Sequence, residues 1–150
     1  MTTVTRPMFD PAVTTIKNSR PESSYSLGGR YEATRARLIE AFERASSVGW
    51  DGYDGVPMSF ATLEYGIRFL WSIPSTVPMP EVAIDPDGEI SFEWYKAPRW
   101  VLSVSVGPRG ELAYAGLFGR RRSHGTAQFV DEIPSDVLHG LGRFLGKISS

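Results

Sequence analysis

The sequence contains no cysteine, which excludes disulfide bonds, thiolate zinc sites and thiol nucleophiles. It also lacks long apolar runs, because the longest hydrophobic stretches are only as long as a strand and none could span a bilayer. The N-terminus carries acids, prolines and threonines where a signal peptide needs an apolar core. These absences predict a cytoplasmic protein.

Neither sign of charge dominates, since the chain has 16 lysines and arginines and 17 acidic residues, and its formal net charge is −1. Such a chain has no global attraction to nucleic acid or to an anionic membrane, so any electrostatic binding has to be local. A hydrophobic content of 41% with 22% charged residues is ordinary globular composition. The length of 150 residues suits one domain with a sizeable core.

Several motifs of common chemistry are also missing, namely a P-loop, a dinucleotide-binding fingerprint and a nucleophile elbow. His124 and His139 have no partner at metal-ligand spacing. The sequence therefore predicts no cofactor, no metal ion and no catalytic residue. An enzyme of unrecognised type stays open as an alternative. Its candidate groups are Asp51, Tyr53, Glu93 and His124.

The first half of the chain shows a tail and two helical patterns. Residues 1–28 are rich in proline and serine with scattered apolar residues, so we expect a flexible tail there and a single domain over residues 29–150. From Arg30 apolar residues recur every three or four positions as far as Val48, which predicts a helix that Gly49 ends. Ser59 can cap a second helix, with a buried stripe that begins at Phe60.

From about residue 80 the hydrophobic period changes to two, which is typical of strands with one buried face. We expect strands at 82–84, 90–94, 100–106 and 112–118, and a short edge strand at 126–129. Turns such as Asp85-Pro86-Asp87-Gly88 join them, and such short connections imply an antiparallel meander. A glycine-containing helix follows from Pro134, with its glycines permitting close approach to the sheet. The predicted fold class is α+β, in the order ααββββ(β)α.

The most distinctive segment is the loop Trp50-Asp51-Gly52-Tyr53-Asp54-Gly55. In a structural interpretation, Trp50 enters the core, Asp51 caps local amides and Tyr53 stays at the surface. In a functional interpretation, the loop is a recognition surface for a protein partner, because tyrosine offers a large contact area at low entropic cost. The candidate partner-binding residues are Trp50, Asp51, Tyr53 and Asp54.

The strongest local charge is the run Arg120-Arg121-Arg122, which is predicted to form a basic turn together with His124. With Arg99 and Arg109, this turn can form a basic strip at one end of the sheet, and Tyr114 or Phe118 can stack a base beside it. The alternative interpretation is a solvated loop or protection against edge pairing. The nucleic-acid-binding candidates are Arg120, Arg121, Arg122 and His124.

A wider pattern resembles a group of small, uncharacterised bacterial proteins. It is carried by Trp50-Asp51-Gly52-Tyr53, Pro57, the Phe60-Ala61-Thr62-Leu63 helix, Pro80-Glu81-Val82, Asp87-Gly88-Glu89-Ile90, Glu93-Trp94, Val104-Ser105-Val106-Gly107 and Tyr114-Ala115-Gly116. The likeness covers roughly residues 38 to 118, and Asp54 stands where a small residue is expected. The resemblance implies a shared fold and a bacterial or mobile-element origin, and it transfers no functional residue.

These features favour a protein-interaction module without chemistry of its own, such as an antitoxin, immunity or anti-defence accessory protein. A nucleic-acid-binding regulator that uses the arginine run is the second hypothesis. A homo-oligomer is also open, because the exposed face of the predicted sheet is either bare or covered by a second subunit.

Overall fold

A computed structural model describes the backbone of residues 22–147 and the side chains of residues 29–147. The chain divides into two units, Met1–Arg30 and Tyr31–Ser150. Positions 1–21 of the expected tail lie outside the described residues. From Glu22 the backbone is already helical, so the first helix begins before the predicted start at Arg30.

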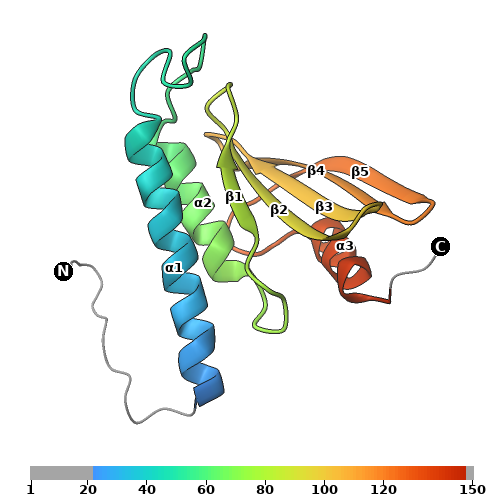
Figure 1. The fold of residues 1–150 in the computed structure, drawn as a ribbon. Coiled ribbons are helices and arrows are strands. Elements are labelled where there is room, and N and C mark those ends of the chain that lie inside the picture. Colours follow the sequence, from blue (N-terminus) through green and yellow to red (C-terminus); the bar gives the residue numbers. More distant parts are fainter. Residues whose placement is uncertain (1–21, 148–150) are drawn as a thin grey trace. The chain divides into compact units, whose positions relative to one another are not determined.

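The described elements follow the predicted order (Figure 1). They are α1 (Glu22–Arg44), α2 (Phe60–Ser72), β1 (Glu81–Ile84), β2 (Ile90–Ala97), β3 (Trp100–Val106), β4 (Glu111–Phe118), β5 (Arg121–Gln128) and α3 (Ser135–Leu145). The strands lie in the sheet in sequence order, and each pairs antiparallel with the next. The predicted α+β meander is confirmed.

One face of the sheet is covered, because α2 and α3 both pack on it. The ring of Phe69 on α2 stacks on Phe92 of β2 with centroids 5.1 Å apart. On α3, a Cβ at Gly140 would lie only 3.2 Å from Leu102 of β3, so glycine brings the helix close to the sheet as predicted. This face therefore supplies most of the hydrophobic core.

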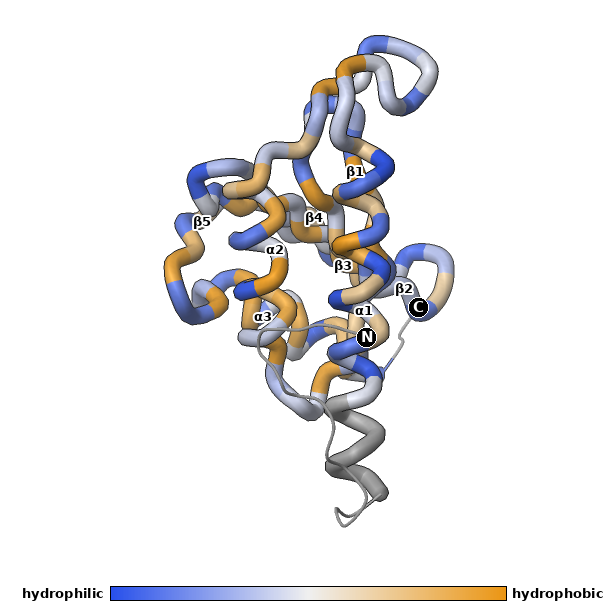
Figure 2. The backbone as a smooth tube through the Cα atoms, turned by 90° about the vertical axis from the view of Figure 1, so that its left-hand side faces the viewer, coloured by the Kyte–Doolittle hydropathy of each residue, from blue (hydrophilic) through white to orange (hydrophobic). Residues whose placement is uncertain are grey.

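Helix α1 packs on α2 rather than directly on the middle of the sheet. The contact is close at Gly66, where a Cβ would meet Ile90 of β2 and lie 3.2 Å from Leu38 of α1. Hydrophilic and hydrophobic residues alternate along α1, as expected for a helix with one buried face (Figure 2). Ser59 caps α2 as predicted, because its Oγ accepts the Thr62 N–H at 3.1 Å.

The other face of the sheet, which we call the open face, carries the alternate residues of the same strands. Its centre consists of small side chains that are exposed or half-exposed, namely Ser91, Ser103, Ser105, Ala113 and Ala115. An antiparallel sheet often buries one face and solvates the other. The open face therefore contributes little to the core.

Two predictions about the ends of the first helices are wrong. Helix α1 ends at Arg44, and Val48 lies beyond it with 83% of its surface exposed. Gly49 has the expected positive φ of 74°, but it belongs to a turn rather than to the helix end. Phe60 is 63% exposed, because it is the first residue of α2 and lies outside the buried stripe. Val48 and Phe60 both continue the helical spacing of apolar residues, but neither is buried by contacts with the rest of the domain.

The arginine run is also placed differently from the prediction. Arg121 and Arg122 open strand β5 rather than standing in a turn, and β5 begins five residues before the expected edge strand at Thr126. Gly119, with φ of 69°, and Arg120 are enough to reverse the chain. The extra strand length follows from this tight turn, because β4 and β5 then pair from Phe118 and Arg121 onward.

Candidate functional site

The α1–α2 loop (residues 45–59) is fixed by its own hydrogen bonds. Asp51 Oδ1 accepts the backbone N–H groups of Tyr53 and Gly55, each at 2.9 Å. The Gly49 N–H donates to the Gly55 carbonyl at 2.8 Å and closes the loop at its base. A Cβ at Gly55 would lie 2.6 Å from Asp51 Oδ1, so the carboxylate needs glycine there. The Asp51 side chain thus holds the loop in shape.

Trp50 ties this loop to the rest of the domain. Its half-buried ring packs against the core, and its Nε1 donates to the Val56 carbonyl at 2.8 Å. The Val56 N–H in turn donates to the carbonyl of Pro86 in the β1–β2 turn at 2.7 Å. The structural interpretation of Trp50 and Asp51 agrees with these contacts. Of the four residues proposed for partner binding, Tyr53 and Asp54 are the ones that stay exposed.

Three apolar side chains of this loop, and that of Phe60 at the start of α2, are exposed. The exposed fractions are 83% for Val48, 84% for Tyr53, 50% for Val56 and 63% for Phe60. Phe60 also makes an edge-to-face contact with Phe42 of α1, at 6.4 Å between ring centroids. Sequence reasoning singled out only Tyr53, because the periodicity placed Val48 and Phe60 in buried stripes.

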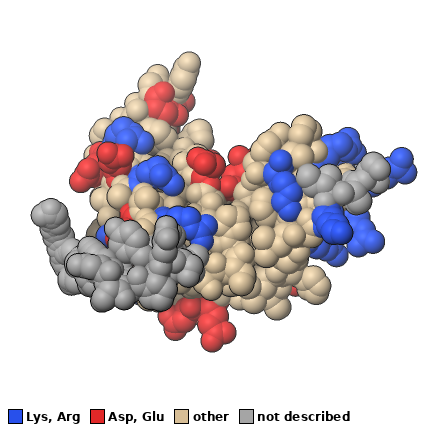
Figure 3. All heavy atoms as spheres, turned by 60° about the horizontal axis from the view of Figure 1, so that its bottom comes forward, with Lys and Arg blue, Asp and Glu red and all other residues tan. Residues whose placement is uncertain are grey.

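A second surface lies at the end of the sheet where the β2–β3 and β4–β5 turns meet. The two turns are joined by the Gly119 N–H, which donates to the Arg99 carbonyl at 2.7 Å. The C-terminus of α3 reaches the same place, because Trp100 Nε1 donates to the Phe144 carbonyl at 3.1 Å. Figure 3 shows lysine and arginine side chains gathered at one end of the view, away from most of the acids.

We call this surface the basic end. Its cations are all exposed: Lys96, Arg99, Arg120, Arg121, Arg122, Arg143 and Lys147. No carboxylate among the described side chains, those of residues 29–147, forms a salt bridge with any of them. Lys96 Nζ donates to the Phe144 and Gly146 carbonyls, so the positive charge of the other six is available to a ligand.

Part of the predicted basic strip is wrong. Arg109 lies in the β3–β4 turn, and in a meander that turn is at the opposite end of the sheet from Arg99. Phe118 is only 4% exposed and Tyr114 lies on the covered face, so neither can stack a base. The exposed aromatic residue near the basic end is Tyr95, at 61%. The sequence could have predicted this, because Tyr95 follows buried Trp94 on the same strand and must therefore point to the other face.

The groups considered for an enzyme are not brought together. Glu93 on β2 and His124 on β5 lie in one row across the open face, but β3 and β4 lie between their strands. The row runs from Glu93 through Ser103 and Ala115 to His124. At about 4.8 Å between neighbouring strands, the backbones of Glu93 and His124 are roughly 14 Å apart. Asp51 is engaged in its loop. This arrangement gives no nucleophile with an adjacent base.

The end of the sheet that faces the α1–α2 loop is acidic. Burial and the neighbouring Asp87 raise the pKa of Asp85. Burial likewise raises the pKa of Glu89, with further contributions from Asp87, Glu111 and Asp85. The β1–β2 turn itself has the predicted form, because the Gly88 N–H donates to the Asp85 carbonyl at 2.8 Å. The sheet therefore carries opposite charges at its two ends.

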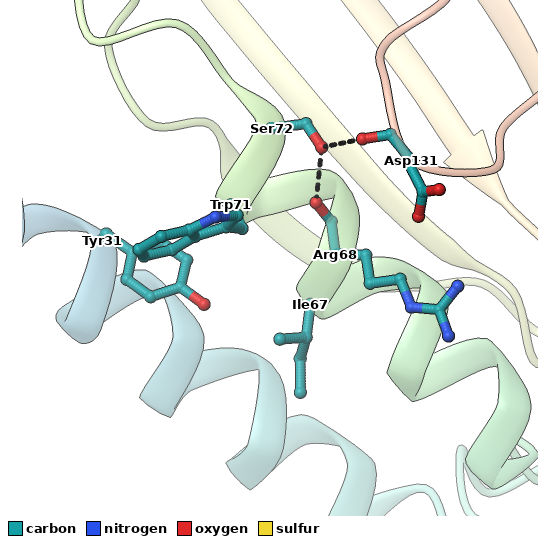
Figure 4. A pocket seen from close by; sticks show the side chains of 6 residues that line it. All are labelled: Tyr31, Ile67, Arg68, Trp71, Ser72 and Asp131. Carbon is teal, nitrogen blue, oxygen red and sulfur yellow. Dashed lines mark hydrogen bonds between the residues drawn. The ribbon is translucent and has the colours of Figure 1, made fainter. Parts of the chain in front are cut away.

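A shallow pocket of about 260 Å³ lies between α1, α2 and the segment before α3 (Figure 4). Tyr31 and Trp71 form one side with ring centroids 5.2 Å apart, and Ile67 lines it beside them. Ser72 Oγ donates to the carbonyls of Arg68 and Asp131, which closes the other side. Burial raises the pKa of Tyr31 to about 12, although Arg35 opposes the shift. The Tyr31 hydroxyl therefore stays protonated at neutral pH.

Among the side chains of residues 29–147, no three histidine or acidic groups are placed to hold a metal ion. No helix within residues 22–147 is both long enough and apolar enough to cross a bilayer. Comparisons with protein-family models, with curated proteins and with solved structures find no significant match to this chain.

Proposed function

We propose that this chain is a non-enzymatic, cytosolic protein-interaction module that binds a protein partner through the α1–α2 loop. The observation that carries the proposal is the 84% exposure of Tyr53 on a loop that Asp51 holds in place. Antitoxins, immunity proteins and anti-defence proteins act in this way, by occupying a partner's surface, and we assign the chain to that class.

The loop has the properties that favour binding energy at such a contact. Its backbone is fixed before binding, so little conformational entropy is lost when a partner docks. Tyr53 provides a large amphipathic surface, and Val48 and Val56 expose further apolar area on the same loop. Asp54 adds a charge at the rim. We expect the partner to offer an apolar pocket for the tyrosine ring and a cation for Asp54.

Site-specific crosslinking in living cells tests this proposal. Replacing Tyr53 by the photoreactive residue p-benzoylphenylalanine should give a covalent adduct with one defined protein, identified by mass spectrometry. The matched control carries the same group at Tyr95, which is 61% exposed but lies on the open face of the sheet. Adducts that are the same at both positions, or no adduct at position 53, would overturn the proposal.

The identified partner then allows a quantitative test. Tyr53→Ala should weaken binding by about 30-fold, the size of a typical hot-spot residue, whereas Tyr95→Ala should leave it unchanged. Asp51→Ala should also weaken binding, because the loop loses the oxygen that fixes it, and Asp51→Asn should retain most of the affinity. Equal effects of the two Asp51 variants would show that its charge, rather than the loop geometry, is recognised.

A further inference from the structure

The basic end contains more positive charge than protection of an edge strand requires. Charged side chains on β5 discourage pairing with another sheet, and this accounts for Arg121 and Arg122. It does not account for Arg99, which lies in the separate β2–β3 turn. The fold brings these arginines together from segments about twenty residues apart.

Arg99 occupies a backbone conformation that disfavours it. Its φ is 65°, and it is the only residue of those described, apart from glycines, with positive φ. Pro98 fixes the preceding position of the turn, and glycine is the usual residue after it at positive φ. Strained residues of this kind concentrate at functional sites. The turn thus keeps an exposed guanidinium where glycine would be more stable.

A platform for flat ligands lies beside these cations on the open face. Tyr95, Val101, Leu117 and Arg122 form one row across β2, β3, β4 and β5. Tyr95 is 61% exposed, and Val101 and Leu117 are half-exposed between it and the arginine. The row spans roughly 14 Å, which is room for the two or three bases that a four-stranded RNA-binding sheet stacks.

The platform is anchored from the covered face. The ladder is irregular between Tyr95 and Ala97, and Lys96 lies at this bulge. Lys96 Nζ donates to the Gly146 carbonyl at 3.0 Å and also to the Phe144 carbonyl, which ties the strand to the end of α3. A bulge of this kind redirects side chains. It leaves Tyr95 exposed on the open face while Lys96 holds the helix.

We propose that the open face binds single-stranded nucleic acid at the basic end, with bases over Tyr95 and phosphates against the arginines. Guanidinium groups form paired hydrogen bonds with phosphate, and an aromatic ring stacks on bases of any identity. The flat platform suits unstacked bases rather than a duplex, whose bases are enclosed in the helix. This site is separate from the α1–α2 loop and does not depend on the proposed protein partner.

The charges on the open face also favour one side of it for the phosphates. Glu81 and Glu93 lie on β1 and β2, whereas Arg122 and His124 lie on β5. Phosphates are therefore repelled from the β1–β2 side and attracted to the β5 side. Glu93 reduces affinity in this arrangement, and its removal should increase binding.

Binding of a fluorescent twelve-nucleotide oligothymidylate to the full chain, measured by anisotropy at several salt concentrations, tests the proposal. The double variant Arg120→Ser, Arg122→Ser should reduce the slope of log affinity against log salt by about 1.4. Arg121→Ser should change the slope less, because Arg121 pairs with buried Phe118 and so lies on the covered side of β5. Tyr95→Ala should weaken binding about tenfold or more with the slope unchanged, because it removes stacking and no charge. Trp71→Ala is the aromatic control and should have no effect, because Trp71 is 74% exposed on α2, away from the open face.

Two further variants test the details. Arg99→Gly should lower the salt slope by about 0.7 while raising the melting temperature by about 2–4 °C, and the latter rules out misfolding as the cause. Glu93→Gln should strengthen binding. Absence of binding at 50 mM salt, an affinity that Tyr95→Ala leaves unchanged, or equal binding of duplex DNA or of vesicles rich in phosphatidylserine would overturn the proposal.

Discussion

The two faces of the sheet are built from alternate residues of the same strands, yet one face is buried in the core and the other is exposed. On the covered face, Phe92 and Val104 are paired neighbours with no exposed surface at all. One residue away, Ser91 and Ser105 are paired on the open face and half-exposed. The comparison teaches that stability resides on one face, so residues on the other are free to serve a ligand.

The largest expected effect comes from truncating the covered face. Phe92→Ala should lower the free energy of unfolding by about 3–5 kcal/mol, because it leaves a cavity beneath α2 and removes the stacking on Phe69. The neighbouring change Ser91→Ala, on the open face, should alter it by less than about 0.5 kcal/mol. Urea unfolding followed by circular dichroism measures both. Similar losses at the two positions would contradict the division between the faces.

A smaller loss is expected where the helices meet above the covered face. Gly66→Ala improves helix propensity, but its Cβ would meet Ile90 and crowd Leu38. Such overpacking costs about 1–3 kcal/mol, so the variant should unfold at lower denaturant concentration than the native protein. A stabilised variant would show that the contact between α1 and α2 is looser than the structure has it.

A modest gain is expected on the solvent side of α3. An added Cβ at Gly142 would meet nothing within 4 Å, so Gly142→Ala should stabilise the protein by about 0.5–1 kcal/mol through helix propensity. Gly140→Ala is the matched control on the same helix, and its contact with Leu102 should reduce or reverse that gain. Thermal unfolding of the two variants compares them directly, and equal melting temperatures would contradict the close approach of α3 to the sheet.

The smallest effect is expected at the edge of the open face. Glu81 of β1 pairs directly with Glu93 of β2, and like charges opposite each other destabilise a sheet. Glu81→Lys should therefore raise the free energy of unfolding by about 0.5 kcal/mol at low salt. Because both side chains are exposed, the gain should shrink in 1 M salt. A gain that is independent of salt would point to another cause.

Local patterns predicted much of this fold. Alternation in residues 90–118 identified three strands and their buried face, since residues two apart lie on one side of a strand. The helical period failed at Val48 and Phe60, because periodicity does not say where tertiary contacts end. The Trp50–Gly55 loop was recognised, and its structural interpretation of Trp50 and Asp51 agrees with the hydrogen bonds. The partner and ligand assignments stay predictions.

The sequence by itself determined the order of the elements, the antiparallel meander and the covered face, because these depend on residue spacing and short turns. The meander also places the β2–β3 and β4–β5 turns at one end of the sheet and Arg109 at the other, so this separation followed from the predicted topology. Only the tertiary structure decided which turns touch and which aromatic rings are buried. It joined the Arg99 carbonyl to the Gly119 N–H, buried Phe118 and left Tyr95 exposed. The reason is physical: binding surfaces combine residues distant in sequence, and chain folding sets their proximity.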